Sequence, residues 1–136
     1  MLSFLKIRNL ALVEDVTWEL AAGLIGVTGE TGAGKSILLD ALGLALGARA
    51  ESSLVRSGAN QASVIAEFHL PAGHAALALL DEQGIEQDEN LILRRQLGSD
   101  GRSRAFVNDQ PVSVGFLKTL GEHLIEIEGQ FETHGL

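Results

Sequence analysis

The sequence predicts one α/β domain in which a glycine-rich turn joins a buried strand to a buried helix. Its 136 residues are 46% hydrophobic and 21% charged, the balance of a single soluble domain. Apolar residues recur along the chain at strand-like and helix-like spacings, so both element types are expected. Five of its 16 glycines fall between Gly23 and Gly34. We therefore expect residues 1–136 to share one core, with the glycine-rich stretch as the most informative segment.

The first third of the chain reads as strands followed by a helix. Leu2–Arg8 and Ala11–Leu20 alternate apolar with polar residues, which predicts two early strands. Leu24–Thr28 is a short apolar run typical of a buried strand. Gly29–Gly34 then forms the turn. Lys35–Gly47 is apolar on nearly every side, so it predicts a mostly buried helix that ends at its last glycine.

The remaining elements are shorter, and their boundaries follow from glycines and from changes of spacing. A helix before Gly84 and a strand pair across residues 98–101 are the clearest of them. The expected elements are a strand at Ser63–Leu70, a helix at Ala72–Gln83, strands at Leu91–Leu97 and Ser103–Val107, a turn at Asn108–Asp109, a short helix at Val112–Leu120 and a final strand at His123–Ile127.

The glycine-rich turn matches the pattern G-x-x-x-x-G-K-[ST], the signature of a phosphate-binding loop. Glycines let the backbone curl so that its N–H groups point at phosphate oxygens, and the following helix N-terminus adds partial positive charge. Lys35 is suited to the β- and γ-phosphates of a nucleotide, and the Ser36 hydroxyl to its Mg²⁺. The predicted nucleotide-binding residues are Gly29, Glu30, Thr31, Gly32, Ala33, Gly34, Lys35 and Ser36.

An eight-residue loop does not decide between classes of nucleotide enzyme. Asp81 and Glu82 follow the apolar run 75–80, and on a strand they could hold Mg²⁺ and activate water, as in a self-contained nucleotide switch or small kinase. The run contains only alanine and leucine, which favours a helix instead. A transporter ATPase usually places an aromatic residue near position 10 to stack on adenine, whereas Leu10 stands here.

Four stretches read together are more specific: Phe4–Leu10, Gly29–Ser36 with Asp40–Arg49, Leu54–Gly58 and Leu124–Gln130. In these stretches the sequence resembles the RecN family of bacterial DNA repair proteins, which is similar to the SMC proteins. The resemblance implies a P-loop NTPase fold with an ABC-type ATPase head, of which residues 1–136 form the N-terminal lobe with its antiparallel β subdomain. It implies ATP and Mg²⁺ as ligands.

The resemblance also assigns roles to residues outside the loop. Gln130 corresponds to the glutamine that reaches Mg²⁺ and the attacking water, which makes it a catalytic candidate beside Lys35. Relatives often carry histidines around this glutamine, where Glu128 and Phe131 stand here. Arg56 lies near the position of an arginine that approaches the nucleotide in SMC heads; a surface arginine is the alternative. Arg8 and Asn9 are candidates for the adenine side.

An ABC-type head needs further motifs that this sequence lacks. The signature motif, the Walker B acids and the switch histidine lie beyond the coiled coil in the family. The resemblance therefore implies two partners, the C-terminal half of the same head and a second head that sandwiches ATP in a homodimer. We expect residues 1–136 alone to hold phosphate without turning it over.

Charge and composition limit the remaining possibilities. Eighteen acidic against ten basic residues give a net charge of −8, so any DNA contact within this part must be local. Arg94, Arg95, Arg102 and Arg104 form the only basic concentration, either a solvated hairpin or a DNA contact. There is no cysteine, and no apolar stretch approaches the length of a membrane span. The expected location is the cytoplasm, at the nucleoid.

Overall fold

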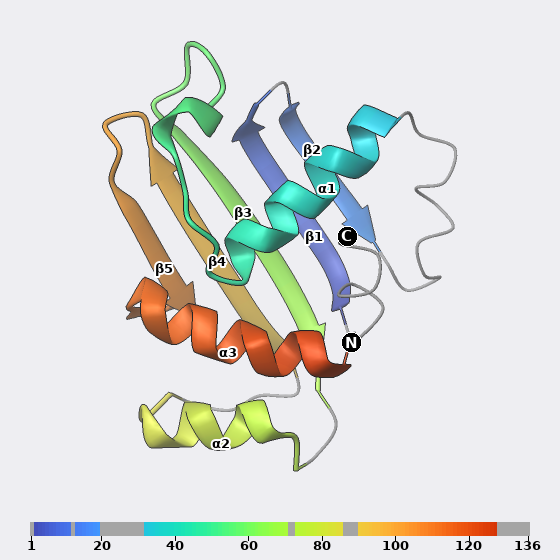
Figure 1. Ribbon diagram of the computed structural model, residues 1–136, viewed down its shortest axis with the longest axis vertical. Coiled ribbons are helices and arrows are strands. Elements are labelled where there is room, and N and C mark those ends of the chain that lie inside the picture. The colour runs from blue at the N-terminus through green and yellow to red at the C-terminus, as the bar shows by residue number, and fades with distance from the viewer. Residues whose placement is uncertain (1, 12, 20–31, 71–72, 86–89, 128–136) are drawn as a thin grey trace.

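A six-stranded antiparallel sheet forms the centre of the computed structural model, which describes residues 2–11, 13–19, 32–70, 73–85 and 90–127. The strand order is β2-β1-β3-β4-β5-β6 (Figure 1). Every neighbouring pair is antiparallel, which confirms the predicted antiparallel β subdomain. The strands are β1 (Leu2–Leu10), β2 (Val13–Glu19), β3 (Gln61–His69), β4 (Asn90–Gly98), β5 (Ser103–Val107) and β6 (Gln110–Val112).

Helices cover one face of this sheet (Figure 1). Helix α1 (Gly32–Ala45) crosses β1, β3 and β4, whereas α3 (Val114–Ile127) packs on β5 and on α2 (Ala75–Glu82). A short 3-10 helix, η2 (Ser52–Leu54), follows α1. The predicted strand at Leu24–Thr28 lies outside the described residues.

The alternation of burial along the strands places the core between the sheet and the helices. In β3 every second residue from Ala62 to Phe68 is buried, and Leu91, Leu93 and Leu97 of β4 share that face. The intervening residues of both strands are at least partly exposed. This period-two pattern is what the sequence predicted for half-buried strands.

Helix α1 begins at Gly32 rather than at the predicted Lys35, because packing of its later turns overrides the weak helix propensity of the first glycines. Ala41, Leu42 and Ala45 are buried, but Leu39 is 49% exposed, so the helix is less fully covered than expected. Its end is as predicted. Gly47 has φ +96°, and the bonds Ala48 N–H to Gly43 O (2.9 Å) and Gly47 N–H to Leu44 O (3.1 Å) form a Schellman cap.

Residues 75–82 form a helix, which contradicts the strand required by the nucleotide switch or small kinase. Helix α2 ends in a second Schellman cap, with Gly84 at φ +71° and Ile85 N–H donating to Leu80 O at 2.9 Å. It begins at Ala75, three residues after the predicted Ala72, because the His74 side chain accepts the Ala76 N–H at 2.8 Å and acts as N-cap.

The predicted helix at Val112–Leu120 is confirmed from Val114 onward, although Val112 itself belongs to β6. The predicted strand at His123–Ile127 is wrong, because α3 continues through these residues. Leu117, Leu120 and Leu124 recur at helical spacing and are all buried on one side. The five-residue segment His-Leu-Ile-Glu-Ile is ambiguous between strand and helix in isolation, and burial in the assembled core decides it. The Ser113 hydroxyl accepts the Phe116 N–H at 3.0 Å and caps the helix at its start.

The predicted turn at Asn108–Asp109 is confirmed. Both residues have positive φ, 48° and 68°, as the tight turn of a two-residue β-hairpin requires. The turn leads into β6, an edge strand of three residues that the sequence did not predict, because a strand this short that contains Pro111 carries almost no pattern.

Candidate functional site

The phosphate-binding motif leads directly into α1. Gly32, the fourth residue of the motif, is the first residue of the helix, so residues 32–36 form its opening turns. The first N–H groups of a helix have no partner within it and carry partial positive charge, the features that bind an anion. Gly29, Glu30 and Thr31 lie outside the described residues, as do the side chains of residues 32–38, among them Lys35 and Ser36.

Helix α1 has its two ends over different parts of the sheet (Figure 1). Its first turn lies toward the end of the sheet where β1 passes into β2, and its last turn lies over β4. The motif at one end and the Schellman cap at the other are therefore about 20 Å apart, at 1.5 Å per helical residue.

Arg95 of β4 holds the carboxyl end of α1. Its side chain is only 3% exposed, and Nη1 donates to Leu44 O at 2.9 Å and to Ala48 O at 2.8 Å. Nε donates to the Ser103 hydroxyl at 2.8 Å, which fixes the plane of the guanidinium. Burial lowers the pKa of Arg95, but arginine stays protonated in proteins, so a positive charge faces the negative end of the helix.

Sequence reasoning missed this role, because it grouped Arg95 with the other arginines of the basic concentration. A signal was present in the strand itself. Leu91, Leu93 and Leu97 alternate on the core side of β4, and Arg95 occupies the matching inward position. An arginine in an inward register with leucines is a candidate for a buried, fully bonded cation.

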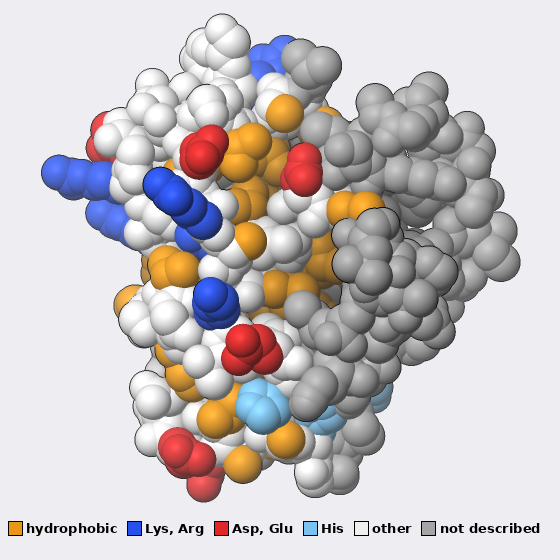
Figure 2. Space-filling view, in the orientation of Figure 1, with side chains coloured by type: hydrophobic (Ala, Val, Ile, Leu, Met, Phe, Trp, Pro, Cys, Tyr) orange, Lys and Arg blue, Asp and Glu red, His pale blue; other side chains and the backbone are white. Residues whose placement is uncertain are grey.

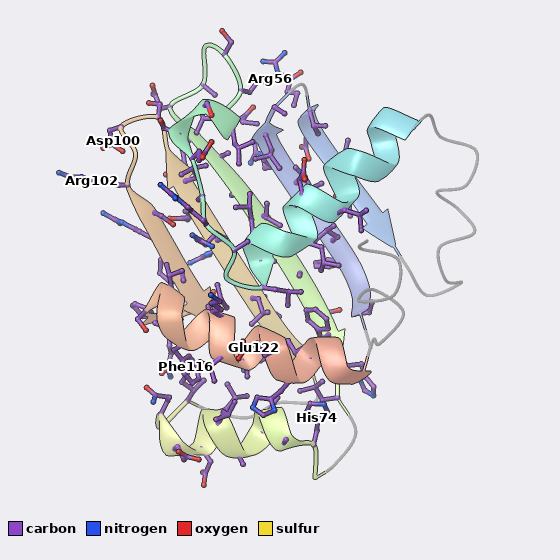
Figure 3. The ribbon with its side chains drawn as sticks, viewed as in Figure 1. Arg56, His74, Asp100, Arg102, Phe116 and Glu122 are labelled. Atoms are coloured by element: carbon purple, nitrogen blue, oxygen red, sulfur yellow. The ribbon has the colours of Figure 1, made fainter. Side chains whose placement is uncertain are left out.

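The other arginines of that concentration have local partners in the hairpin. Arg94 points to the opposite face from Arg95, where it lies 4.2 Å from the centroid of the Phe106 ring and 3.8 Å from the Asp109 carboxylate. Arg102 lies 3.6 Å from Asp100 at the hairpin turn, at the edge of the sheet (Figure 3). Arg104 is exposed. These contacts favour the solvated hairpin over a DNA contact.

Two of the three candidates for the nucleotide periphery meet at one end of the sheet. Asn9 has φ +53°, and its carbonyl accepts the Arg56 N–H at 2.7 Å. Leu54 O accepts the Ala11 N–H at 2.7 Å, so the segment after η2 is bonded to the end of β1. Arg56 is half-buried, toward the same end of the molecule as the start of α1 (Figure 3). Arg8, the third, is exposed on β1.

The remaining candidates are the acidic pair Asp81 and Glu82 and the glutamine Gln130. Asp81 and Glu82 lie exposed in the last turn of α2, which removes them as a Walker B pair. Gln130 lies outside the described residues, a few positions beyond the end of α3. Among the residues that the structure describes, no cluster of three or more histidine or acidic side chains could hold a metal ion. Within the same residues, no helix is long and apolar enough to cross a membrane.

Residues 5–130 match the AAA domain family, a span that contains the phosphate-binding motif, α1 and Arg95. The chain belongs to the AAA domain family. This AAA domain is similar to the DNA repair protein RecN of Vibrio cholerae serotype O1, at 48% identity over 130 residues. It is 47% identical over 133 residues to RecN of Haemophilus influenzae. The resemblance to the RecN family is thus confirmed.

Each of these matches covers 96% of this chain and 24% of the relative, so the chain spans about a quarter of the length of these curated relatives. A solved structure from a study of ATP-driven dimerization and DNA-stimulated activation of SMC ATPases has the same fold. It matches with a TM-score of 0.70 at 20% identity, over 91% of this chain and 79% of that chain. The predicted fold, the N-terminal lobe of an SMC-type head, is confirmed.

Proposed function

We propose that the chain is the ATP-binding part of an ATPase that acts in DNA double-strand-break repair and recombination. One observation carries the proposal. Helix α1 starts inside the motif G-x-x-x-x-G-K-[ST], so the free N–H groups of a helix N-terminus coincide with the residues that the sequence assigns to phosphate. The similar proteins from Vibrio cholerae and Haemophilus influenzae are DNA repair proteins by name, which supports the cellular role.

In this proposal the motif Gly29–Ser36 binds ATP together with Mg²⁺. Lys35 contributes a positive charge to the β- and γ-phosphates, and the Ser36 hydroxyl is a ligand of the metal. Gln130 orients the attacking water and reaches Mg²⁺, as the resemblance implies. When bound, Mg²⁺ neutralises the charge that develops on the transferred phosphoryl group.

Arg56, Arg8 and Asn9 form the periphery of the proposed site. The hydrogen bond from the Arg56 N–H to Asn9 O joins the end of β1 to the residues that follow η2. Both lie at the same end of the molecule as the start of α1 (Figure 3). We propose that Arg56 approaches the nucleotide phosphates and that Arg8 and Asn9 border the adenine.

The rest of the active site is proposed to come from other parts of the protein. The C-terminal half of the same head would supply the Walker B acids, and a second head would close over the ATP in a homodimer. The helix-bearing face supports this idea, since Leu39 of α1 is 49% exposed there and hydrophobic side chains gather over its middle (Figure 2). Burial of such a face by another part of the head would be favourable.

The proposed reaction is attack of water on the γ-phosphate of ATP, releasing ADP and phosphate. Lys35 and the backbone N–H groups of the motif stabilise charge on the phosphates, and the acids that position water are supplied by the completed head. Engagement of broken DNA by the full-length protein is proposed to follow the opening and closing of the two heads. Such a protein works in the cytoplasm, at the nucleoid.

Nucleotide binding can be tested on the chain itself with a fluorescent ATP analogue and Mg²⁺, followed by anisotropy. We expect saturable binding that Lys35→Ala weakens by about tenfold or more, the loss of one strong charge-assisted contact. Lys118→Ala is the matched control, because Lys118 is exposed on α3 near the opposite end of α1, and it should leave the affinity unchanged. Absence of saturable binding, or equal binding by Lys35→Ala, would overturn the proposal.

A further inference from the structure

The carboxyl end of α1 is held by contacts with the sheet and with α3. In the sheet, Arg95 donates to the carbonyls of Leu44 and Ala48. Helix α3 approaches the same end so closely at two points that only glycine fits there. A Cβ on Gly121 would lie 2.6 Å from Leu46 O, and one on Gly47 would lie 2.5 Å from the Cα of Lys118. These contacts leave the end of α1 little freedom to slide or tilt.

Of the two carbonyls that Arg95 bonds, Leu44 O belongs to the last turn of α1 and Ala48 O to the segment that follows it. A cation bonded on both sides of the helix end fixes where that end lies, and it neutralises the negative end of the helix dipole. Ser103 fixes the guanidinium from the neighbouring strand β5, so the cation is itself anchored to the sheet. Arg95 therefore ties the position of the carboxyl end of α1 to β4 and β5.

The opposite end of the same helix carries the phosphate-binding motif. An α-helix is stiff over the length of α1, so a shift at the carboxyl end is transmitted to the N-terminal N–H groups. Phosphate binding by backbone N–H groups depends on their position to a fraction of an ångström. We propose that Arg95 is a positioning residue for the nucleotide site, acting through α1 on the phosphate-binding N–H groups; this rests on the proposed function.

Arg94, the residue before Arg95 in the same strand, provides a matched control. Its side chain lies on the opposite face, over the Phe106 ring and beside Asp109. Arg94→Met and Arg95→Met therefore remove the same charge and the same donors from adjacent residues, but only the second releases the end of α1. Arg95→Lys is the conservative variant, since its ammonium can still donate to one or both carbonyls.

The test combines two measurements on the chain and its three variants: amide hydrogen exchange in the free protein, and binding of the fluorescent ATP analogue with Mg²⁺. For Arg95→Met we expect exchange of the α1 amides to rise clearly more than that of the β1 and β3 amides. The affinity for the analogue should fall about tenfold, the factor for one hydrogen bond to a charged group. Arg95→Lys should recover part of both losses, and Arg94→Met should show neither.

The outcomes separate the two proposals. If the wild type binds the analogue, Lys35→Ala does not, and Arg95→Met binds as well as the wild type, then the inference about Arg95 fails alone. Exchange that rises equally in α1, β1 and β3 would reduce Arg95 to a general stabilising residue and would also overturn it. If the wild type binds no analogue, the proposed function fails, and the inference fails with it.

Discussion

Replacing Gly121 with alanine should destabilise the domain although alanine is the better helix former. Gly121 is buried within α3, where the helix passes the end of α1. An added Cβ would lie 2.6 Å from Leu46 O and 3.0 Å from Leu46 Cβ. A backbone oxygen cannot rotate away, and the bonds of Arg95 and of the Schellman cap hold this segment in place. The clash must therefore be relieved by moving one helix away from the other.

The expected size follows from two opposing terms. Alanine gains about 1 kcal/mol over glycine in a helix interior. Overpacking of a well-packed site costs about 1–3 kcal/mol, and a backbone contact belongs at the upper end of that range. The free energy of unfolding should thus fall by about 1–2 kcal/mol, and the melting temperature by roughly 4–8 °C for a domain of this size.

Urea titration of Gly121→Ala and Gly43→Ala would measure the difference. Gly43 lies within α1, and a Cβ there would meet only Ala48 Cβ at 3.8 Å, an ordinary contact. Gly43→Ala should therefore stabilise the chain by up to about 1 kcal/mol. If Gly121→Ala raises the unfolding free energy as much as Gly43→Ala, then α1 and α3 do not approach as closely as described. That result would refute the claim that α3 restrains the carboxyl end of α1.

Three further predictions use the same chain. Leu117→Ala, at a fully buried position of α3, should lower the unfolding free energy by about 2–5 kcal/mol in urea titration; a loss below 1 kcal/mol would contradict the described core. Asp109→Gly should be more stable than Asp109→Ala by about 1 kcal/mol, since φ is +68° there; equal melting temperatures would argue against the turn. Asp81→Asn and Glu82→Gln should leave binding of the ATP analogue unchanged, and a loss of affinity would return them to the site.

Much of the fold is readable from local pattern because burial follows one face of each strand. The alternation in β3 and β4 and the glycines that end α1 and α2 are local features with a direct physical cause. The helix at residues 75–82 is also local, since alanine and leucine favour it strongly. These elements needed no knowledge of their neighbours.

The predictions from sequence fail where contacts with distant parts of the chain decide the secondary structure. Residues His123–Ile127 could form a strand or a helix, and Leu117, Leu120 and Leu124 on one side of α3 settle the matter only once the core is assembled. The three-residue strand β6 exists because β5 offers an edge for it to pair with. Neither signal is present in the segment itself.

The candidate site shows the same division. The phosphate-binding motif is contiguous in the sequence, so pattern alone finds it. Arg95 acts on carbonyls 51 and 47 positions earlier in the chain, and no spacing rule connects them. The pairing of Asn9 with Arg56 was likewise invisible, although both residues were candidates through the family resemblance.

In the proposed function, this chain supplies the phosphate-binding half of an ATPase head that other parts of the protein complete. The most direct test is release of phosphate from ATP by the chain before and after addition of the C-terminal half of the head. We expect negligible turnover by the chain alone, turnover after mixing, and loss of that turnover in Lys35→Ala. Turnover by the chain alone that depends on Lys35, or no turnover after mixing, would contradict it.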